Sequence, residues 1–195
     1  MRQKTGLSIL ISIVAIYAIV WAWFEYRPTP ETRKPGEAAA NLDPKEDGAP
    51  TTDLRDLGPA HDIGIKTDKG EIRLSQFKGK VVLLDFRATW CGPCAEAIPG
   101  VEDLYEKNRS RGLVVLGVAL ERDNGDSMPA FVERHKMTYP VGMPSNVEDV
   151  VRFSTGSIPL TVIVDKKGEI RWQQNGWMPK LDEIIPVVVD KLLKE

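Results

Sequence analysis

The sequence is poor in cysteine and histidine, which limits how its fold can be cross-linked and which sites it can carry. Only two of its 195 residues are cysteines and two are histidines. Cys91 and Cys94 are close neighbours, so no disulfide framework can join distant parts of the chain. A zinc site on this pair would lack ligands, because there is no second cysteine pair and His61 and His135 are far apart in sequence. The cysteines are therefore expected to serve chemistry, and no metal is predicted.

The chain also lacks an excess of charge of either sign. It has 26 Lys and Arg against 28 Asp and Glu, a formal net charge of -2. No basic excess is available to attract nucleic acid or an acidic lipid surface, so a nucleic-acid partner is excluded. The length and a hydrophobic content of 42% suit one globular domain with additional non-globular sequence.

The N-terminal segment has no charged residue from position 5 to position 24. This length matches the roughly 20 residues that a helix needs to cross a bilayer core of about 30 Å. Arg2 and Lys4 precede the segment, and Trp21 and Trp23 stand at its far end, where a membrane–water interface would lie. We expect a transmembrane anchor at residues 5–24, after a short cytoplasmic tail at residues 1–4.

A cleaved secretory signal is the alternative for this segment. The apolar part of a signal peptide is usually shorter, and bulky residues after Val20 leave no small-x-small cleavage site. The uncleaved anchor is therefore favoured. Basic residues lie on both sides of the segment, so loop charge alone leaves the orientation open.

Residues 25–59 contain six of the 14 prolines of the chain and almost no large aliphatic side chains. This composition is typical of a disordered, fairly stiff tether. It predicts a Pro-rich linker at residues 25–59, followed by a globular domain at residues 60–195.

The globular part alternates between strand and helix patterns. The apolar, β-branched run at residues 80–86 is typical of a central strand buried on both faces. Turn signals and periodicity predict the remaining elements: hairpins at 63–74 and 160–173, a strand at 113–120, an extended piece at 139–141, and helices near 91–108, 127–135, 147–153 and 179–193. The order predicts an α/β fold with a central mixed sheet flanked by helices, an N-terminal hairpin and an inserted strand–helix element.

The chemical motif is Trp-Cys-Gly-Pro-Cys at residues 90–94, at the start of a predicted helix. Cys91 would lie at the helix N-terminus, where the dipole lowers a thiol pKa, so it is the expected nucleophile. Cys94, one turn further in, is the expected resolving thiol. Pro93 suits the first helical turn, and Gly92 leaves the backbone open to an incoming chain.

Asp85 is an acid within the apolar run that precedes the motif. A buried carboxylate without a partner would take up a proton, so Asp85 is a candidate acceptor for the Cys94 proton. The alternative is a solvated, structural Asp85 at the end of the strand.

In these motifs the chain resembles the membrane-anchored thioredoxin-like proteins of the TlpA/ResA type. The resemblance rests on residues 79–86, 88–94, Pro99, 158–161 and the turn at 165–168, and it covers about residues 60–195. It implies a thioredoxin-like fold and a thiol:disulfide oxidoreductase whose redox group is the Cys91–Cys94 pair, with no other cofactor. In that family, the proline that matches Pro159 follows a cis peptide bond and faces the motif. The residues of this chain alone favour a trans bond at Pro159. Trp90, Gly92, Pro93, Ile158 and Pro159 would contact the substrate.

The same resemblance implies partners and a location. The catalytic domains of proteins in that family usually face the periplasm or the outer side of the membrane. There they take electrons from a membrane reductase and reduce protein disulfides, including apocytochrome c cysteines.

Two departures weaken the cytochrome c assignment. Arg87 stands where the family usually has an aromatic residue, and Ala97 stands where the ResA subgroup has Glu. Glu96 is adjacent, but helical geometry turns it about 100° away. Asp85 and the Gly92-Pro93 dipeptide instead match thioredoxin itself and favour a reducing potential with a broader substrate range.

Two other functions stay open. A thiol peroxidase would use one reactive cysteine against peroxide, although a Pro-x-x-x-Thr-x-x-Cys pattern is missing. A tethered scaffold or chaperone would bind partners through its surface without using its cysteines.

Overall fold

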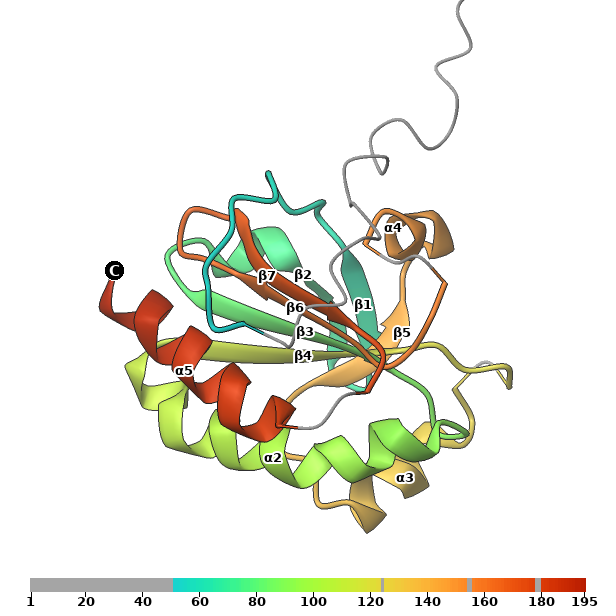
Figure 1. The fold of residues 1–195 in the computed structure, drawn as a ribbon. Helices are drawn as coiled ribbons and strands as arrows, with labels where there is room; N and C mark the ends of the chain where they lie inside the picture. Colours follow the sequence, from blue (N-terminus) through green and yellow to red (C-terminus); the bar gives the residue numbers. More distant parts are fainter. Residues whose placement is uncertain (1–50, 124, 154–155, 178–179) are drawn as a thin grey trace, which may run out of the picture. The chain divides into compact units, whose positions relative to one another are not determined.

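The strand predicted at residues 80–86 is β3 (Val81–Arg87), and the sheet is arranged around it (Figure 1). The computed structural model describes residues 51–123, 125–153, 156–177 and 180–195. The predicted tail, the anchor and most of the linker lie outside these ranges. Within them, no helix has the length and apolar character needed to cross a membrane.

One seven-stranded mixed sheet forms the centre, in the order β2-β1-β5-β4-β3-β6-β7. β3 runs parallel to β4 and antiparallel to β6, and β4 runs parallel to β5. The other strands are β1 (Gly64–Thr67), β2 (Gly70–Arg73), β4 (Leu113–Ala119), β5 (Val141–Pro144), β6 (Leu160–Val164) and β7 (Ile170–Asn175). The predicted mixed α/β architecture is confirmed.

Helices lie on both faces of this sheet. Figure 1 shows α2, α3 and α5 on one side and α4 on the other. Their bounds are α2 (Gly92–Asn108), α3 (Met128–Arg134), α4 (Val147–Val151) and α5 (Leu181–Lys194), with 3-10 turns η1 (Leu74–Phe77) and η2 (Arg109–Arg111). Each predicted helix is present, with ends that differ by a few residues, as expected where helix termini fray.

The two faces of β3 belong to different hydrophobic cores. Val81 and Leu83 pack with the buried residues of α2, α3 and α5, whereas Val82, Leu84 and Phe86 pack on the side of η1 and α4. Because side chains alternate along a strand, Asp85 and Arg87 point to the same side as Val81 and Leu83. Two charged residues therefore lie on the α2 side of the sheet.

The N-terminal hairpin joins the main sheet through β5. β1 pairs antiparallel with β5, with Ile65 opposite Pro144 and Lys66 opposite Met143. A Cβ at Gly142 would lie 2.2 Å from the Lys66 carbonyl oxygen, so only glycine permits this approach. The sequence predicts the hairpin but not its place in the sheet.

Packing begins before the expected boundary at residue 60. The Trp172 Nε1 donates to the Thr51 carbonyl oxygen at 3.0 Å, and the Leu57 N–H donates to the Ile170 carbonyl oxygen at 3.0 Å. Leu54 and Leu57 also pack against the two cores. The end of the expected linker therefore covers β7, because it carries two of the three leucines of this segment.

Candidate active site: a disulfide above a buried ion pair

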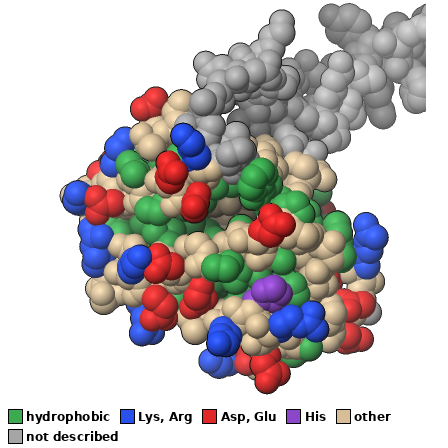
Figure 2. All heavy atoms as spheres, turned by 60° about the horizontal axis from the view of Figure 1, so that its bottom comes forward, with side chains coloured by type: hydrophobic (Ala, Val, Ile, Leu, Met, Phe, Trp, Pro, Cys, Tyr) green, Lys and Arg blue, Asp and Glu red, His purple; other side chains and the backbone are tan. Residues whose placement is uncertain are grey.

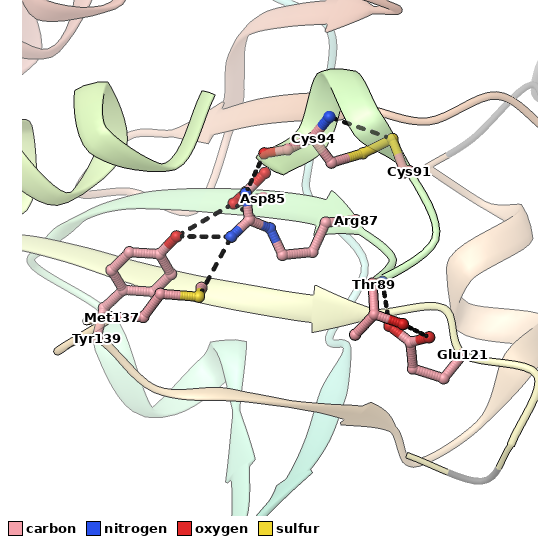
Figure 3. A network of polar contacts seen from close by, with 8 residues as sticks. All are labelled: Asp85, Arg87, Thr89, Cys91, Cys94, Glu121, Met137 and Tyr139. Carbon is pink, nitrogen blue, oxygen red and sulfur yellow. Dashed lines mark hydrogen bonds and ion pairs between the residues drawn. A yellow bond between two sulfur atoms is a disulfide. The ribbon is translucent and has the colours of Figure 1, made fainter. Parts of the chain in front are cut away.

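Cys91 and Cys94 are joined in a disulfide at the start of α2 (Figure 3). Cys91 is the N-cap residue of the helix, and its sulfur accepts a hydrogen bond from the Cys94 N–H at 3.2 Å. Pro93 occupies the first turn, where its missing N–H costs no helical bond. A thiolate at Cys91 would lie where the helix dipole and free N–H groups stabilise negative charge.

The two cysteines differ in access to solvent. Cys94 is fully buried, whereas Cys91 keeps a small exposed fraction of 7% and packs with Ala88 and Ile158. Gly92 and Pro93 are exposed. An incoming sulfur can therefore approach Cys91 but not Cys94, which is the asymmetry expected of a nucleophile and a resolving thiol.

Asp85 lies beneath the disulfide, on the same side of the sheet as α2. It is only 3% exposed, so the solvated alternative does not hold. The Tyr139 hydroxyl donates to its Oδ2 atom at 3.4 Å. Burial raises the pKa of the Asp85 carboxyl above its ordinary value, while the charge of Arg87 and the Tyr139 hydroxyl act to lower it.

Arg87 is the partner that supplies this charge. Its Nε atom lies 2.9 Å from Asp85 Oδ2, an ion pair rather than an aligned hydrogen bond. Its Nη1 donates to the Tyr139 hydroxyl at 3.1 Å and to the Met137 sulfur at 3.5 Å, and its Nη2 donates to the Cys94 carbonyl oxygen at 2.9 Å. Figure 3 shows this network between β3, the first turn of α2 and the segment that leads into β5. Asp85 is thus buried, with Arg87 and Tyr139 as its polar partners.

A second polar contact fixes the loop between β3 and the motif. The Glu121 carboxylate, just after β4, accepts hydrogen bonds from the N–H and the hydroxyl of Thr89 at 2.6 and 2.8 Å. The Thr89 hydroxyl is also 3.2 Å from the Ser127 hydroxyl. These bonds hold the residue next to Trp90 against the end of β4 (Figure 3).

The rim of the site carries exposed aromatic side chains. Trp90 is 51% exposed, with the Arg122 guanidinium 4.3 Å above its ring. Trp177 is 52% exposed. Figure 2 shows the face of α2 and α3, where acidic and basic side chains are interspersed around apolar ones. This face has no broad patch of one charge among the residues described.

Pro159 is preceded by a cis peptide bond, as the resemblance implies. It lines a cavity of about 420 Å³ together with Asp85, Glu96, Ala97 and Trp177. Asp85 is therefore buried but borders a space that opens to solvent. Ile158, the residue before Pro159, packs against the disulfide.

Residues 49–173 match the model of the AhpC/TSA family. The chain belongs to the AhpC/TSA family. Within it, the chain is 33% identical over 112 residues to the thiol-disulfide oxidoreductase ResA of Geobacillus kaustophilus, covering 57% of this chain and 64% of that protein.

Other relatives agree with this placement. The chain is 30% identical over 126 residues to ResA of Oceanobacillus iheyensis, covering 64% of this chain and 61% of that one. Its fold matches a Chlorobium tepidum protein assigned as the thiol:disulfide interchange protein DsbE, with a TM-score of 0.66, 26% identity and coverage of 72% and 99%. The match thus spans less than two thirds of the length of these two ResA proteins. These relatives support the TlpA/ResA resemblance.

Within this AhpC/TSA family fold, the structure brings all the predicted site residues to one end of the sheet and adds four. Arg87, Tyr139, Glu121 and Trp177 were not predicted to be site residues. Arg87 could have been found from strand alternation, which puts residues two apart on one face. Tyr139, Glu121 and Trp177 reach the site from separate segments, and no local pattern marks them.

Proposed function

We propose that this chain is a thiol:disulfide oxidoreductase that reduces protein disulfides through Cys91 and Cys94. The observation that carries the proposal is the position of the disulfide: it caps α2, leaves a small exposed surface on Cys91 and none on Cys94, and lies over the buried Asp85 (Figure 3). The naming of the ResA relatives as thiol-disulfide oxidoreductases supports it.

The reaction needs a dithiol, a substrate disulfide and a proton acceptor. The Cys91 thiolate attacks one sulfur of the substrate disulfide, which forms a mixed disulfide and expels the other sulfur as a thiolate. Cys94 gives its proton to the Asp85 carboxylate, and its sulfur attacks Cys91 and expels the second substrate thiolate. Each expelled thiolate takes a proton from solvent, and Asp85 returns its own to solvent. The substrate gains two electrons, and the protein becomes the Cys91–Cys94 disulfide.

Trp90, Gly92, Pro93, Ile158 and Pro159 are the proposed substrate contacts. Trp90, Gly92 and Pro93 are exposed around Cys91, while Ile158 packs against the disulfide. An extended substrate segment would lie along the backbone of Ile158 and place its sulfur at Cys91. Exposed aromatic surface beside the cysteine suits an unfolded or extended protein segment.

The reductive direction is part of the proposal, and the Gly92-Pro93 dipeptide and Asp85 support it. We expect a reduction potential near thioredoxin's value of about -270 mV. An equilibrium titration of the full chain against glutathione measures it. A value near about -120 mV, typical of a strong oxidant, would refute a reductase.

We also propose that residues 5–24 anchor the chain in a membrane, with the catalytic domain extracytoplasmic and the electrons supplied by a membrane reductase. The uncharged N-terminal segment and the TlpA/ResA resemblance support this. Apocytochrome c is the substrate that the resemblance offers, and loss of c-type cytochromes in a deletion strain tests it.

Two variants of the full chain test the oxidoreductase. Cys94→Ser should accumulate mixed disulfides with substrate proteins, because resolution is lost, whereas Cys91→Ser should form none. Unchanged function of Cys91→Ser would indicate a scaffold. Consumption of peroxide at a rate above that of disulfide reduction would indicate a peroxidase.

A further inference from the structure

Arg87 is a positively charged residue whose side chain is shielded from solvent. The side chain is fully buried at the end of β3. A guanidinium in such a place must be matched by protein groups, because burying an unpaired charge is strongly unfavourable. Arg87 is matched on three elements: by Asp85 on its own strand, by Tyr139 before β5, and by the Cys94 carbonyl oxygen in α2.

The pairing changes what Asp85 can do. A carboxyl buried in an apolar site takes up a proton, and a protonated carboxyl cannot accept another from a thiol. The Arg87 charge opposes this by favouring the carboxylate. Without Arg87, the pKa of the Asp85 carboxyl would be higher still, and a larger share of this proposed proton acceptor would already carry a proton before the reaction begins.

Arg87 also ties this acid to the residue whose proton it would take. The Nη2 atom donates to the carbonyl oxygen of Cys94 itself, while Nε contacts Asp85 (Figure 3). The planar, rigid guanidinium of Arg87 thus holds the first turn of α2 in place over β3. A lysine would keep the charge but could not span these partners at once.

We propose that Arg87 is a positioning residue for disulfide exchange, which keeps Asp85 as a carboxylate beneath Cys94 so that Asp85 can take the Cys94 proton when the mixed disulfide is resolved. The inference rests on the proposed oxidoreductase function and extends it, because it explains why a cation occupies this buried position.

Few other groups of the described residues can replace this charge. Tyr139 is in contact with Asp85, but burial and Asp85 raise its pKa above the ordinary value, so it stays neutral. Glu96, Lys180 and Asp182 line the cavity beside Asp85 and are themselves exposed, so solvent and salt screen them. Thr161 lines the same cavity from β6 and carries no charge.

The experiment separates the two chemical steps in the reduced full chain. Reduced protein is mixed with dithiobis(nitrobenzoate) in a stopped-flow instrument. Attack by Cys91 releases one coloured nitrothiobenzoate, and resolution by Cys94 releases the second. The rate of the second release is then measured across a pH series, where it should rise as Asp85 ionises.

Arg87→Gln and Arg87→Lys form a matched pair, since both keep N–H donors but only the second keeps the charge. In Arg87→Gln we expect the midpoint of the second release to move up by at least about one pH unit. Below both midpoints, the second release should then be at least about tenfold slower. Arg87→Lys should keep the midpoint within about half a unit of the wild type, and Asp85→Asn should abolish this titration. The first release should change little in all three.

Superimposable pH profiles for Arg87→Gln and the wild type would overturn the proposal. If Arg87→Gln does not fold, carbon-13 NMR of the Asp85 carboxyl in the wild-type chain decides instead: a carboxylate at pH 7 supports the role, and a protonated carboxyl refutes it. Absence of both releases in the wild type would refute the oxidoreductase itself, whereas an unshifted second release refutes only Arg87.

Discussion

Glu121 holds Thr89 by two hydrogen bonds to one carboxylate, at 2.6 Å to its N–H and 2.8 Å to its hydroxyl. The two bonds join the end of β4 to the loop that carries Trp90 and Cys91, so they couple the sheet to the position of Cys91, the proposed nucleophile. Hydrogen bonds to a charged acceptor are shorter and stronger than those between neutral groups.

Glu121→Ala should therefore lower the free energy of unfolding by about 1–3 kcal/mol, because two partly buried donors lose their acceptor. Urea unfolding of the oxidised protein measures this loss. Glu133→Ala, at an exposed position of α3, is the matched control and should change little. Equal losses in the two variants would show that the Thr89 contact contributes nothing.

Asp85 should make the stability of the oxidised protein depend on pH. Its folded-state pKa is raised from 3.8, chiefly by burial, so the folded state binds a proton more tightly than the unfolded state. Its contribution is complete below the unfolded pKa and is lost as pH rises through the folded pKa.

Wild-type protein should therefore lose stability relative to Asp85→Asn as pH rises from about 4. Urea unfolding at a series of pH values measures the difference between the two proteins. A difference that stays constant across the series would mean that Asp85 titrates alike in the folded and unfolded chains.

Asp165 should show the opposite dependence. It is buried in the turn before β7, where its Oδ1 accepts from the N–H groups of Lys167 and Glu169 and its Oδ2 pairs with Arg171. Burial acts to raise its pKa, but the Glu169 N–H and Arg171 outweigh it and hold the pKa below 3.8.

The contribution of Asp165 is therefore present above that value and is lost as pH falls through the folded pKa. Asp165→Ala should cost about 1–3 kcal/mol at neutral pH and less in acid, because two partly buried N–H groups lose their acceptor and Arg171 keeps only Glu195 as a carboxylate partner. Asp68→Ala, in the exposed β1–β2 turn, is the control for the same titration. Parallel pH curves for both variants would contradict the assignment.

Gly142 should be intolerant of any side chain. A Cβ there would lie 2.2 Å from the Lys66 carbonyl oxygen, so Gly142→Ala should separate β1 from β5. We expect a clear fall in Tm and faster amide exchange in the N-terminal hairpin. Gly100→Ala in α2 is the control, because its Cβ would meet Asp182 at an ordinary 3.8 Å and alanine favours a helix. Retained protection of β1 in Gly142→Ala would show that the sheet can adjust.

Much of this structure could be predicted from the sequence because its signals are local. The run at residues 80–86 is predicted to be a buried strand because of its β-branched residues and its length, and this prediction needs no knowledge of the neighbouring strands. The Cys91–Cys94 spacing and Pro93 identify a helix start that carries two thiols. The roles proposed for these cysteines are predicted from the same short segment.

Tertiary structure decided the rest. Asp85 could be recognised as out of place, but whether it was solvated or buried, and with which partner, depended on Arg87, Tyr139 and the first turn of α2 meeting at one point. The pairing of β1 with β5 likewise joins segments far apart in the chain. The sequence by itself was enough to predict a dithiol or disulfide centre at the start of α2, since helix capping and thiol spacing act over a few residues. Only the fold decided that Asp85 is buried and paired with Arg87 beside the disulfide, because burial and ion pairing depend on contacts between distant segments.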